Sequence, residues 1–474
     1  MPAWPRSSAH ARLTRSPGNF RMKSSALPCR LPTDKGLSMR TALLVLLTVL
    51  FVSGSLAAQD NIRTIPFDTI SGGFRAIPIA VDQMTAAAGA VTPDDSALMR
   101  AVTGVIQYDL DFYADFELIP VDSFFVQTYE LTELNVMSWG RLGADYVVFL
   151  ECQFPGPNML VNWRLVDTRS RREISDGRFD YHRQFWRLLA HDIANQIVQV
   201  MTGDPGIFRT KIVYVKKIGQ AKELFLADFD GANERQLTDN GSLNVSPAFA
   251  PDLEHIYFTS YMDGPPQLYR VDVISGVIEQ VAEYPGSITA PSVSPDGKKI
   301  ACVLSKDGNH EIYVLDLQGR IIKRVTRHPA IESSPTWSPD GRYIAYSSDR
   351  TGSPQIYVSD ADGIDTRRLT FVGGYNDSPV WSRRGDRITF VSRTPRGRFD
   401  LASIDTSGYD YRVMTQLGTN ENPHFSPDGK HIVFSSTRLS SGDIFTMDVS
   451  GRNQRRLTRE GNISNPAWGP IPKR

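Results

Sequence analysis

The chain has 474 residues, of which 41% are hydrophobic and 22% are charged. These values are typical of a globular protein and exclude a disordered or membrane-embedded chain, while the length predicts two or more domains. The 52 basic residues balance the 52 acidic ones, which excludes a global field that would draw the protein onto nucleic acid or an anionic membrane.

The first apolar segment of the chain is typical of an export signal. Met39 and a following arginine precede an apolar run from Ala42 to Val52, and the small residues Ser55 and Ala57 fit a signal-peptidase site. The run is far shorter than the ~20 residues of a membrane-spanning helix, so it favours a cleaved signal peptide over the alternative, a membrane anchor. We therefore predict a signal peptide at 39–57 and a periplasmic protein.

Residues 1–38, upstream of this signal, have none of the features of a folded domain. They are rich in Arg, Ser and Pro and show no apolar periodicity. We interpret them as an extension of a chain whose true start is Met39. Detection of these residues in the expressed protein by peptide mass spectrometry would contradict this interpretation.

Residues 71–203 mix strand-like and helix-like patterns, which predicts a small α/β domain. Strands are predicted over 74–81, 116–120 and 145–151, with a hairpin over 159–167 and 172–181. Helices are predicted over 96–110, 129–142 and 184–202. In the last of these helices Trp186, Leu189 and Ile193 recur at helical spacing.

The rest of the chain is an internal repeat of about 44 residues. One landmark is a proline that recurs with gaps of 43 or 44 residues, at Pro247, Pro291, Pro335, Pro379, Pro423 and Pro466. A second landmark is an aspartate that recurs with gaps of 43 to 45 residues, at Asp228, Asp272, Asp316, Asp360, Asp405 and Asp448. The two landmarks independently indicate six copies.

Each copy is predicted to form four short strands, as the fourth copy illustrates. Its strands are expected at 335–338, 343–347, 355–359 and 367–370. The pair Asp340-Gly341 supplies the positive φ of a tight hairpin. A four-stranded unit of about 40–45 residues is typical of a propeller blade, which buries both faces only against its neighbours. We therefore predict an all-β six-bladed β-propeller over 207–474.

The two landmarks are out of phase at the ends of the repeat region. The first blade has predicted strands at 211–215, 223–228 and 234–238 but lacks an innermost strand. The segment 465–470 matches that missing strand. We therefore predict that the ring closes when the C-terminal strand pairs into blade one.

These features together resemble the TolB family, the periplasmic propeller of the Tol-Pal cell-envelope system. The most specific parts are repeated Ser-Pro-Asp-Gly turns at 294–297, 338–341 and 426–429 and the Ile-Tyr-x-x-Asp strands. The strand at 76–81 and the join from Phe185 through Tyr214 also look like those of the family. The chain departs from the pattern in the turns at 250–253 and 382–385, and at Pro66 and Phe67.

The resemblance implies a non-enzymatic adaptor that supports outer-membrane integrity and envelope constriction at cell division. It implies that one mouth of the propeller binds the peptidoglycan-associated lipoprotein Pal. It also implies a flexible segment over 58–70 that binds TolA, through Gln59, Asp60, Asn61, Ile62, Arg63, Thr64 and Ile65. We expect a monomer that binds no nucleic acid and reaches membranes only through its partners.

The Pal-binding surface is predicted on the loops that run from each outer strand to the next inner strand. These loops all open on one face of the ring, and loops on a rigid scaffold commonly carry binding sites. The predicted residues are Asn244, Val245, Ser287, Thr289, Ala290, Glu332, Ser333, Asn376, Asp377, Asn420 and Glu421. The alternative is that they are plain solvated turns.

Neither catalysis nor a cofactor is expected. The acidic turns that start at Asp228 and Asp360 lack the full spacing of a calcium loop, and the cysteines Cys29, Cys152 and Cys302 show no zinc spacing. No GxSxG nucleophile motif occurs, which excludes the hydrolases that carry a similar propeller. A propeller lyase or glycosidase, with convergent acids in its channel, stays open. The alternative function is a generic extracytoplasmic propeller that binds another protein, peptide or glycan.

Overall fold

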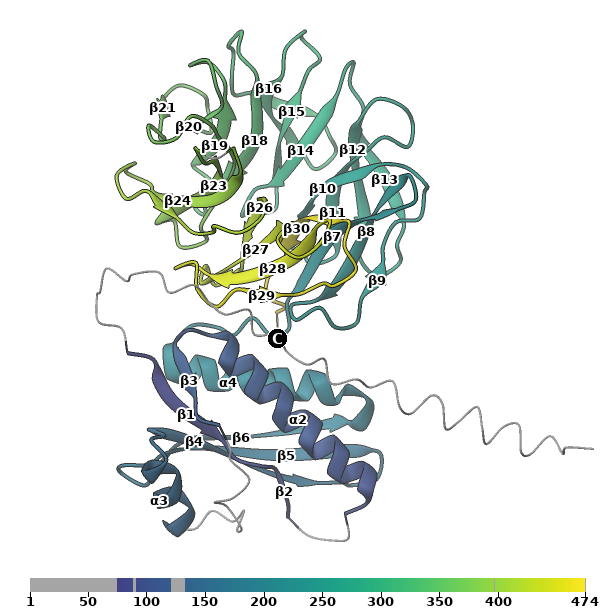
Figure 1. Cartoon of the computed structure of the whole chain (residues 1–474). Helices are drawn as coiled ribbons and strands as arrows, with labels where there is room; N and C mark the ends of the chain where they lie inside the picture. The colour runs from purple at the N-terminus through teal and green to yellow at the C-terminus, as the bar shows by residue number, and fades with distance from the viewer. Residues whose placement is uncertain (1–74, 88–90, 121–132, 396, 474) are drawn as a thin grey trace, which may run out of the picture. The chain divides into compact units, whose positions relative to one another are not determined.

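The computed structural model describes residues 75–87, 91–120, 133–395 and 397–473, with the side chains of residues 133 and 134 left out (Figure 1). These residues belong to one compact unit that begins at Asn61. The predicted upstream extension, signal peptide and TolA-binding segment lie outside the described residues. Within those ranges, no helix is long and apolar enough to cross a membrane.

An α/β domain forms the first part of the described chain, as predicted. Its strands are β1 (Ile77–Val81), β2 (Thr85–Ala86), β3 (Phe116–Leu118), β4 (Tyr146–Gln153), β5 (Asn158–Asp167) and β6 (Arg172–His182). They form one sheet in the order β3-β1-β4-β5-β6, and β2 pairs with β4. β1 is parallel to β3 and β4, whereas β4, β5 and β6 form an antiparallel meander.

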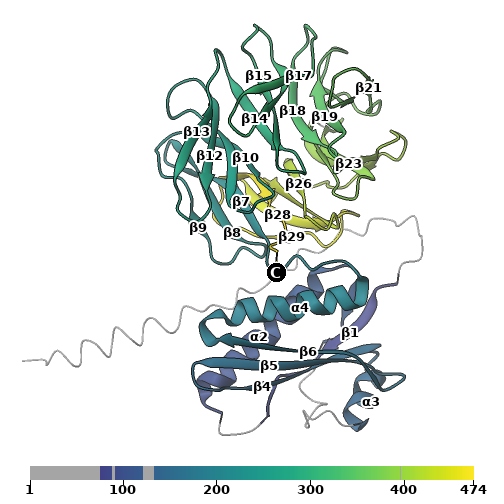
Figure 2. The same cartoon turned by 180° about the vertical axis from the view of Figure 1, so that it is seen from behind.

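Three α-helices cover the two faces of this sheet (Figures 1 and 2). They are α2 (Pro93–Phe112), α3 (Glu133–Arg141) and α4 (Trp186–Thr202), and the short 3-10 helix η1 (Arg183–Phe185) precedes α4. α2 and α4 lie on one face and α3 lies on the other. The larger core therefore forms under α2 and α4, and a smaller one under α3 contains Val136 and Trp139.

Capping residues account for the observed bounds of these helices. α2 starts earlier than the predicted 96–110 because Thr92 and Asp95 form a capping box and Pro93 occupies the first turn. α4 ends where Gly203 adopts a left-handed φ of 78°.

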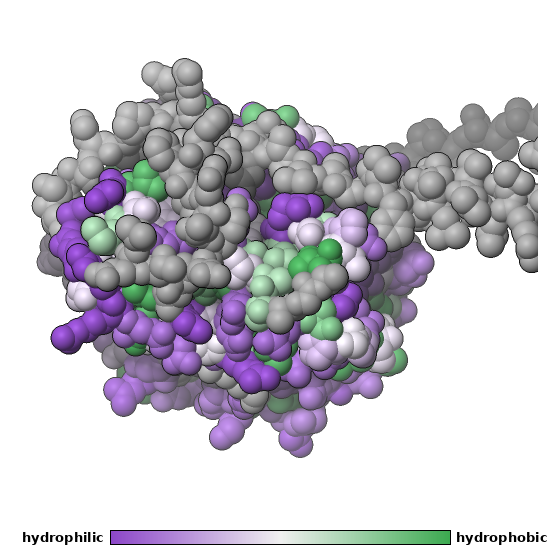
Figure 3. All heavy atoms as spheres, turned by 90° about the horizontal axis from the view of Figure 1, so that it is seen from below, coloured by the Kyte–Doolittle hydropathy of each residue, from purple (hydrophilic) through white to green (hydrophobic). Residues whose placement is uncertain are grey.

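The outer surface of this domain is mostly hydrophilic where it is visible (Figure 3).

Six four-stranded sheets form the propeller, in agreement with the predicted number of blades. Five of them follow the chain order, namely β10-β11-β12-β13, β14-β15-β16-β17, β18-β19-β20-β21, β22-β23-β24-β25 and β26-β27-β28-β29. The sixth has the order β30-β7-β8-β9 and joins the last strand of the chain to the first three strands of the repeat.

The innermost strands are β10 (Asn244–Phe249), β14 (Ile288–Val293), β18 (Glu332–Trp337), β22 (Asn376–Trp381), β26 (Asn420–Phe425) and β30 (Ile463–Trp468). The second strands are β7 (Lys211–Ile218), β11 (His255–Ser260), β15 (Lys299–Leu304), β19 (Tyr343–Ser348), β23 (Arg387–Arg393) and β27 (His431–Ser436). The third strands are β8 (Ala221–Asp228), β12 (Gln267–Asp272), β16 (Glu311–Asp316), β20 (Gln355–Asp360), β24 (Phe399–Asp405) and β28 (Asp443–Asp448). The short outermost strands are β9 (Arg235–Gln236), β13 (Ile278–Ala282), β17 (Ile321–Arg324), β21 (Thr366–Arg368), β25 (Arg412–Val413) and β29 (Arg455–Arg456).

The C-terminal strand closes the ring as predicted. β30 pairs antiparallel with β7, and Trp468 lies opposite Ile212. The Trp468 indole is 1% exposed and donates a hydrogen bond to Thr210 Oγ1 at 2.8 Å. The two ends of the propeller are therefore held in one sheet.

Candidate functional site: the propeller channel and the domain junction

Each innermost strand carries a bulge at its landmark proline. The residue before the proline has a positive φ of 49° to 53°, at Ser246, Ala290, Ser334, Ser378, Asn422 and Asn465. The pairing register with the second strand shifts at the same place, for example between Val245 and Ala248. A bulge of this kind accommodates a residue that has no N–H to donate and lets the strand continue through it.

The residues predicted to bind Pal were expected in loops, and this placement was wrong. All but Ser287 lie within the first three residues of an innermost strand, and Ser287 immediately precedes β14. The proline resembled the start of a strand because it lacks an N–H. Because of the bulge, each innermost strand begins three residues before its landmark proline.

Four of the predicted residues have no exposed surface, namely Asn244, Glu332, Asn376 and Asn420. The three asparagines link neighbouring blades: Asn244 Nδ2 donates to Glu223 Oε2 at 2.9 Å, and Asn376 Nδ2 donates to Gln355 Oε1 at 2.9 Å. The Asn420 amide makes the matching bond to Asp400 Oδ1 at 3.0 Å. Their role is structural, and a partner could not contact them without repacking the blades.

The second residue of each of these strands is more accessible. Val245, Thr289, Ser333 and Asp377 are half-buried and Glu421 is exposed. Tyr375 donates a hydrogen bond to Asp377 Oδ2 at 2.9 Å, whereas the Glu421 carboxyl makes no hydrogen bond to the described residues. This end of the ring is the strand-start mouth, and it has a partly acidic rim.

The innermost strands line a channel with a volume of about 200 Å³. Its polar lining consists mainly of serine, threonine and asparagine side chains. Among the described residues, no aspartate or glutamate contributes to the lining, and its ionisable residues are Arg383 and His424. The described residues contain no group of three or more His, Cys, Asp or Glu that could hold a metal ion.

Arg383 projects into this channel from the turn between β22 and β23. More than a third of its surface is accessible, yet the side chain makes no hydrogen bond or ion pair with the described chain. The surrounding protein lowers the pKa of the guanidinium, which stays protonated. Burial, assisted by the charge of Arg383, also lowers the pKa of His424 to about 4. Neutral His424 accepts a hydrogen bond from the Trp468 amide at its Nδ1 atom, at 3.1 Å.

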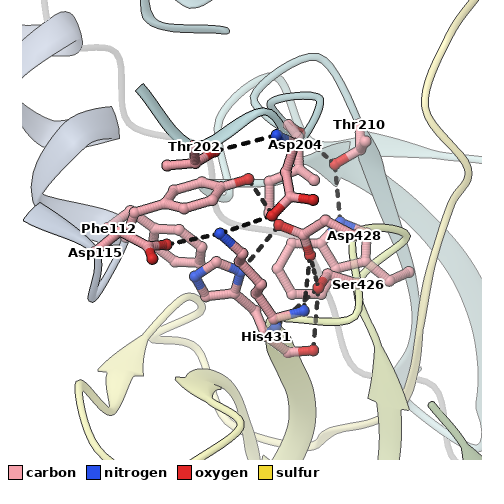
Figure 4. A network of polar contacts seen from close by, with 12 residues as sticks. Phe112, Asp115, Thr202, Asp204, Thr210, Ser426, Asp428 and His431 are labelled. Carbon is pink, nitrogen blue, oxygen red and sulfur yellow. Dashed lines mark hydrogen bonds and ion pairs between the residues drawn. The ribbon is translucent and has the colours of Figure 1, made fainter. Parts of the chain in front are cut away.

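The Ser-Pro-Asp-Gly turn of blade six anchors the propeller to the α/β domain (Figure 4). Tyr113 donates its hydroxyl to Asp428 Oδ2 at 2.7 Å, and Lys430 Nζ lies 2.8 Å from Asp115 and 2.9 Å from Asp204. Burial would raise the pKa of Asp428, but the nearby His431 ring and the hydroxyl of Ser426 outweigh it and hold that pKa well below its usual value.

Aromatic packing extends this junction. The Phe112 ring lies 4.4 Å from the His431 ring and 5.5 Å from the Phe229 ring, between centroids. Arg384, next to Arg383, donates to Asp204 Oδ2 at 3.0 Å. The turns of the propeller therefore meet the α/β domain, and the strand-start mouth lies at the other end of the innermost strands.

Neither the position of Arg383 in the channel nor that of Phe229 at the domain junction was predicted from the sequence. The replacement of Ser-Pro-Asp-Gly by Ser382-Arg383-Arg384-Gly385 was visible, and it was the signal that could have identified Arg383. No comparable signal marks Phe229, because an aromatic residue after a strand is common in both turns and cores.

An α/β domain fixed to a six-bladed ring, with a polar channel along the ring axis, defines a two-domain propeller protein. Residues 68–174 match the TolB amino-terminal domain, and residues 198–472 match the TolB beta propeller domain. The chain belongs to the TolB family.

Individual relatives agree with this assignment. The chain is similar to the Tol-Pal system protein TolB of Roseobacter denitrificans, with 33% identity over 50% of this chain and 53% of the relative. It is 36% identical to the TolB of Geobacter sulfurreducens over 44% of this chain and 47% of the relative. The chain thus spans about half the length of the curated relatives it matches. The crystal structure of TolB from Acinetobacter baumannii is similar with a TM-score of 0.73 and 26% identity, over 84% of this chain and 97% of that one.

Proposed function

We propose that this protein is a non-enzymatic periplasmic adaptor of the Tol-Pal system. In this proposal the strand-start mouth binds the lipoprotein Pal, and residues 59–65 bind TolA. The protein would thereby link an inner-membrane energy-transducing complex to an outer-membrane lipoprotein. Membership of the TolB family supports the assignment to the Tol-Pal system. The export signal predicted from the sequence supports a location in the periplasm.

One observation supports the choice of the strand-start mouth as the site that binds Pal. The α/β domain contacts turns at one end of the ring, through Asp428 and Lys430, whereas accessible side chains of several blades converge at the other end. The backbone there is rigid because buried asparagines tie adjacent blades together. A rigid rim of accessible polar residues suits the binding of a folded partner without a large rearrangement.

The proposed binding of Pal is tested by Ser333→Arg, with Ala290→Arg as a second variant on the neighbouring blade. We expect each arginine to weaken binding of the soluble domain of Pal by about tenfold or more, because it introduces bulk and charge at the rim. Isothermal titration calorimetry measures the affinity, and thermal melting checks that the ring is folded.

The matched control is Gln318→Arg, an exposed turn position at the opposite end of blade three, whose affinity should equal that of the wild type. Wild-type affinity in folded Ser333→Arg and Ala290→Arg proteins would rule out this mouth as the Pal site.

The proposed binding of TolA requires a separate experiment. Deletion of residues 59–65 from the mature protein should abolish binding of TolA and leave the affinity for Pal unchanged. Retained TolA binding would contradict the assignment of this segment. Recovery of an unrelated receptor or a glycan, in place of Pal and TolA, in pulldowns from solubilised envelopes would favour the alternative of a generic binding propeller.

A further inference from the structure

The channel contains a cationic side chain with no counter-charge. Its lining contains no acid, and Arg383 has no acceptor among the described residues. The adjacent Arg384 differs, because it donates to both Asp204 Oδ2 and the Asp428 carbonyl at 3.0 Å. Although more than a third of Arg383 is accessible, the protein around the rest of the side chain offers the guanidinium no acceptor, and an anion in the channel would supply one.

The turn that carries Arg383 does not need an arginine. In blade four the corresponding residue is Pro339, and Gly341 N donates to Ser338 O at 2.9 Å. In blade five Gly385 N donates to Ser382 O at the same 2.9 Å. Because the turn keeps its backbone hydrogen bond with either residue, the guanidinium is an addition to the channel and not a requirement of the fold.

We propose that the propeller channel is an anion-binding site in which Arg383 binds a carboxylate. A planar guanidinium binds a carboxylate through two parallel hydrogen bonds. The hydroxyl of Ser378 and the amide of Asn422, both half-buried in the lining, are donors that could serve the remaining lone pairs. The volume of about 200 Å³ suits an acidic side chain or a small organic acid and excludes a folded domain.

Two sources could supply this carboxylate. One is a free small carboxylic acid, and the other is an acidic side chain of a partner that enters through the strand-start mouth. Only the second rests on the proposed function. Asp377 and Glu421 near that mouth would repel a carboxylate at the rim, so a partner's acid would be stable only deeper in the channel, beside Arg383.

The test is titration of the full mature protein with sodium acetate at constant ionic strength, followed through the arginine side-chain NMR signals. We expect one Nε–H signal to shift saturably, and we expect Arg383→Gln and Arg383→Pro to remove that response. Arg383→Pro restores the residue type found in blade four, so it should fold. The control, Arg342→Gln, removes an arginine with 81% side-chain exposure from the matching turn of blade four and should leave the response intact. A wild-type protein without a saturable response, or a response that survives Arg383→Pro, would overturn the inference.

Binding of Pal to the same variants distinguishes the sources. A loss of about fivefold or more in Pal affinity in Arg383→Pro, together with competition by acetate, would identify a partner carboxylate. Unchanged Pal affinity beside a lost acetate response would identify a free acid. If wild-type protein fails to bind Pal, the proposed function fails, while the acetate titration still decides whether the channel binds anions.

Discussion

Glu332 is a carboxyl group with no exposed surface at the start of β18. Arg350 Nη2 and Ser348 Oγ each lie 3.0 Å from its Oε1 atom, and Oε2 has no hydrogen-bond partner in the part of the chain that the structure describes. Burial raises the pKa of Glu332 to about 7, although Arg350 opposes the shift. Because the folded state holds this proton more tightly than the unfolded state, stability decreases as the pH rises from about 4.5 to about 7.

Glu332→Gln should remove this loss. The amide keeps an acceptor for Arg350 and Ser348 and has no charge to bury. We expect the variant to gain about 1 to 3 kcal/mol relative to the wild type between pH 5 and pH 8, measured by urea unfolding at each pH. Glu254→Gln, at an exposed position, is the control and should follow the wild-type curve. A constant difference between Glu332→Gln and wild type across this range would contradict the shifted pKa.

His424 should have the opposite effect. Its pKa of about 4 lies below that of an unfolded histidine, near 6.5, so stability decreases as the pH falls from about 6.5 to about 4. His424→Asn keeps an acceptor for the Trp468 amide and cannot be protonated in this range. Urea unfolding at pH 4.5 and pH 7 should show a smaller acid-induced loss in the variant than in the wild type. Equal losses would show that His424 does not titrate as described.

Contacts between blades depend on close backbone approach in their turns. Gly363 has a φ of 73°, and an added Cβ would lie 2.1 Å from the Val325 carbonyl oxygen of the preceding blade. Gly352 has a φ of 93°, but apart from its chain neighbours no atom of the described residues lies within 4 Å of an added Cβ. The two glycines therefore separate the effect of steric overlap from that of backbone strain.

Gly352→Ala should cost about 1 to 2 kcal/mol of stability from the left-handed backbone alone. Gly363→Ala should cost clearly more, because the blade must also move away from its neighbour. Chemical denaturation of both variants under one condition measures the difference. Equal destabilisation would mean that the blades separate easily at this contact.

β30 is the element on which closure of the ring depends. Deletion of residues 463–474 leaves β7 without its partner strand and removes the buried Trp468, so we expect a large decrease in melting temperature. Deletion of only Lys473 and Arg474 is the control and should leave the melting temperature unchanged. If the longer deletion also melts like the full-length protein, pairing of β30 with β7 does not stabilise the ring.

At the scale of the whole molecule, the α/β domain and the propeller share one hydrophobic core. Leu110 and Ile193 come from the helices, Phe208 from the linker, and Phe229 and Trp468 from the propeller. The domains are connected by both this core and the ion pairs of Lys430 with Asp115 and Asp204. We therefore expect calorimetry of the wild-type protein to show a single unfolding transition.

Phe229→Ala should uncouple the domains, at a cost of about 3 to 5 kcal/mol, because it leaves a cavity between them. The expected result is two separate calorimetric transitions. Phe371→Ala, at a residue that is 71% exposed, should leave one transition. A single cooperative transition in the Phe229→Ala protein would show that polar contacts suffice to couple the domains.

The sequence by itself determined the blade number, the α/β domain and the closure by the C-terminal strand. Hairpin turns depend on local chemistry, such as Asp340-Gly341, and the landmark proline and aspartate of the repeat each recur six times along the chain. The helix of residues 184–202 was predictable for the same reason, since its apolar face recurs along a short stretch of chain. The accessible residues of the strand-start mouth were predicted only approximately, because the bulge before each proline moves the start of the strand.

Only the tertiary structure decided where side chains meet. Phe112 and Phe229 are far apart in the sequence, and no periodicity connects them, yet they pack 5.5 Å apart at the domain junction. The lack of an acidic neighbour for Arg383 likewise depends on the residues that the five other blades contribute to the channel lining. The burial of a side chain and the pairing of its charge depend on all the neighbours that the fold brings around it. Strand and turn formation are governed mainly by residues adjacent in the sequence.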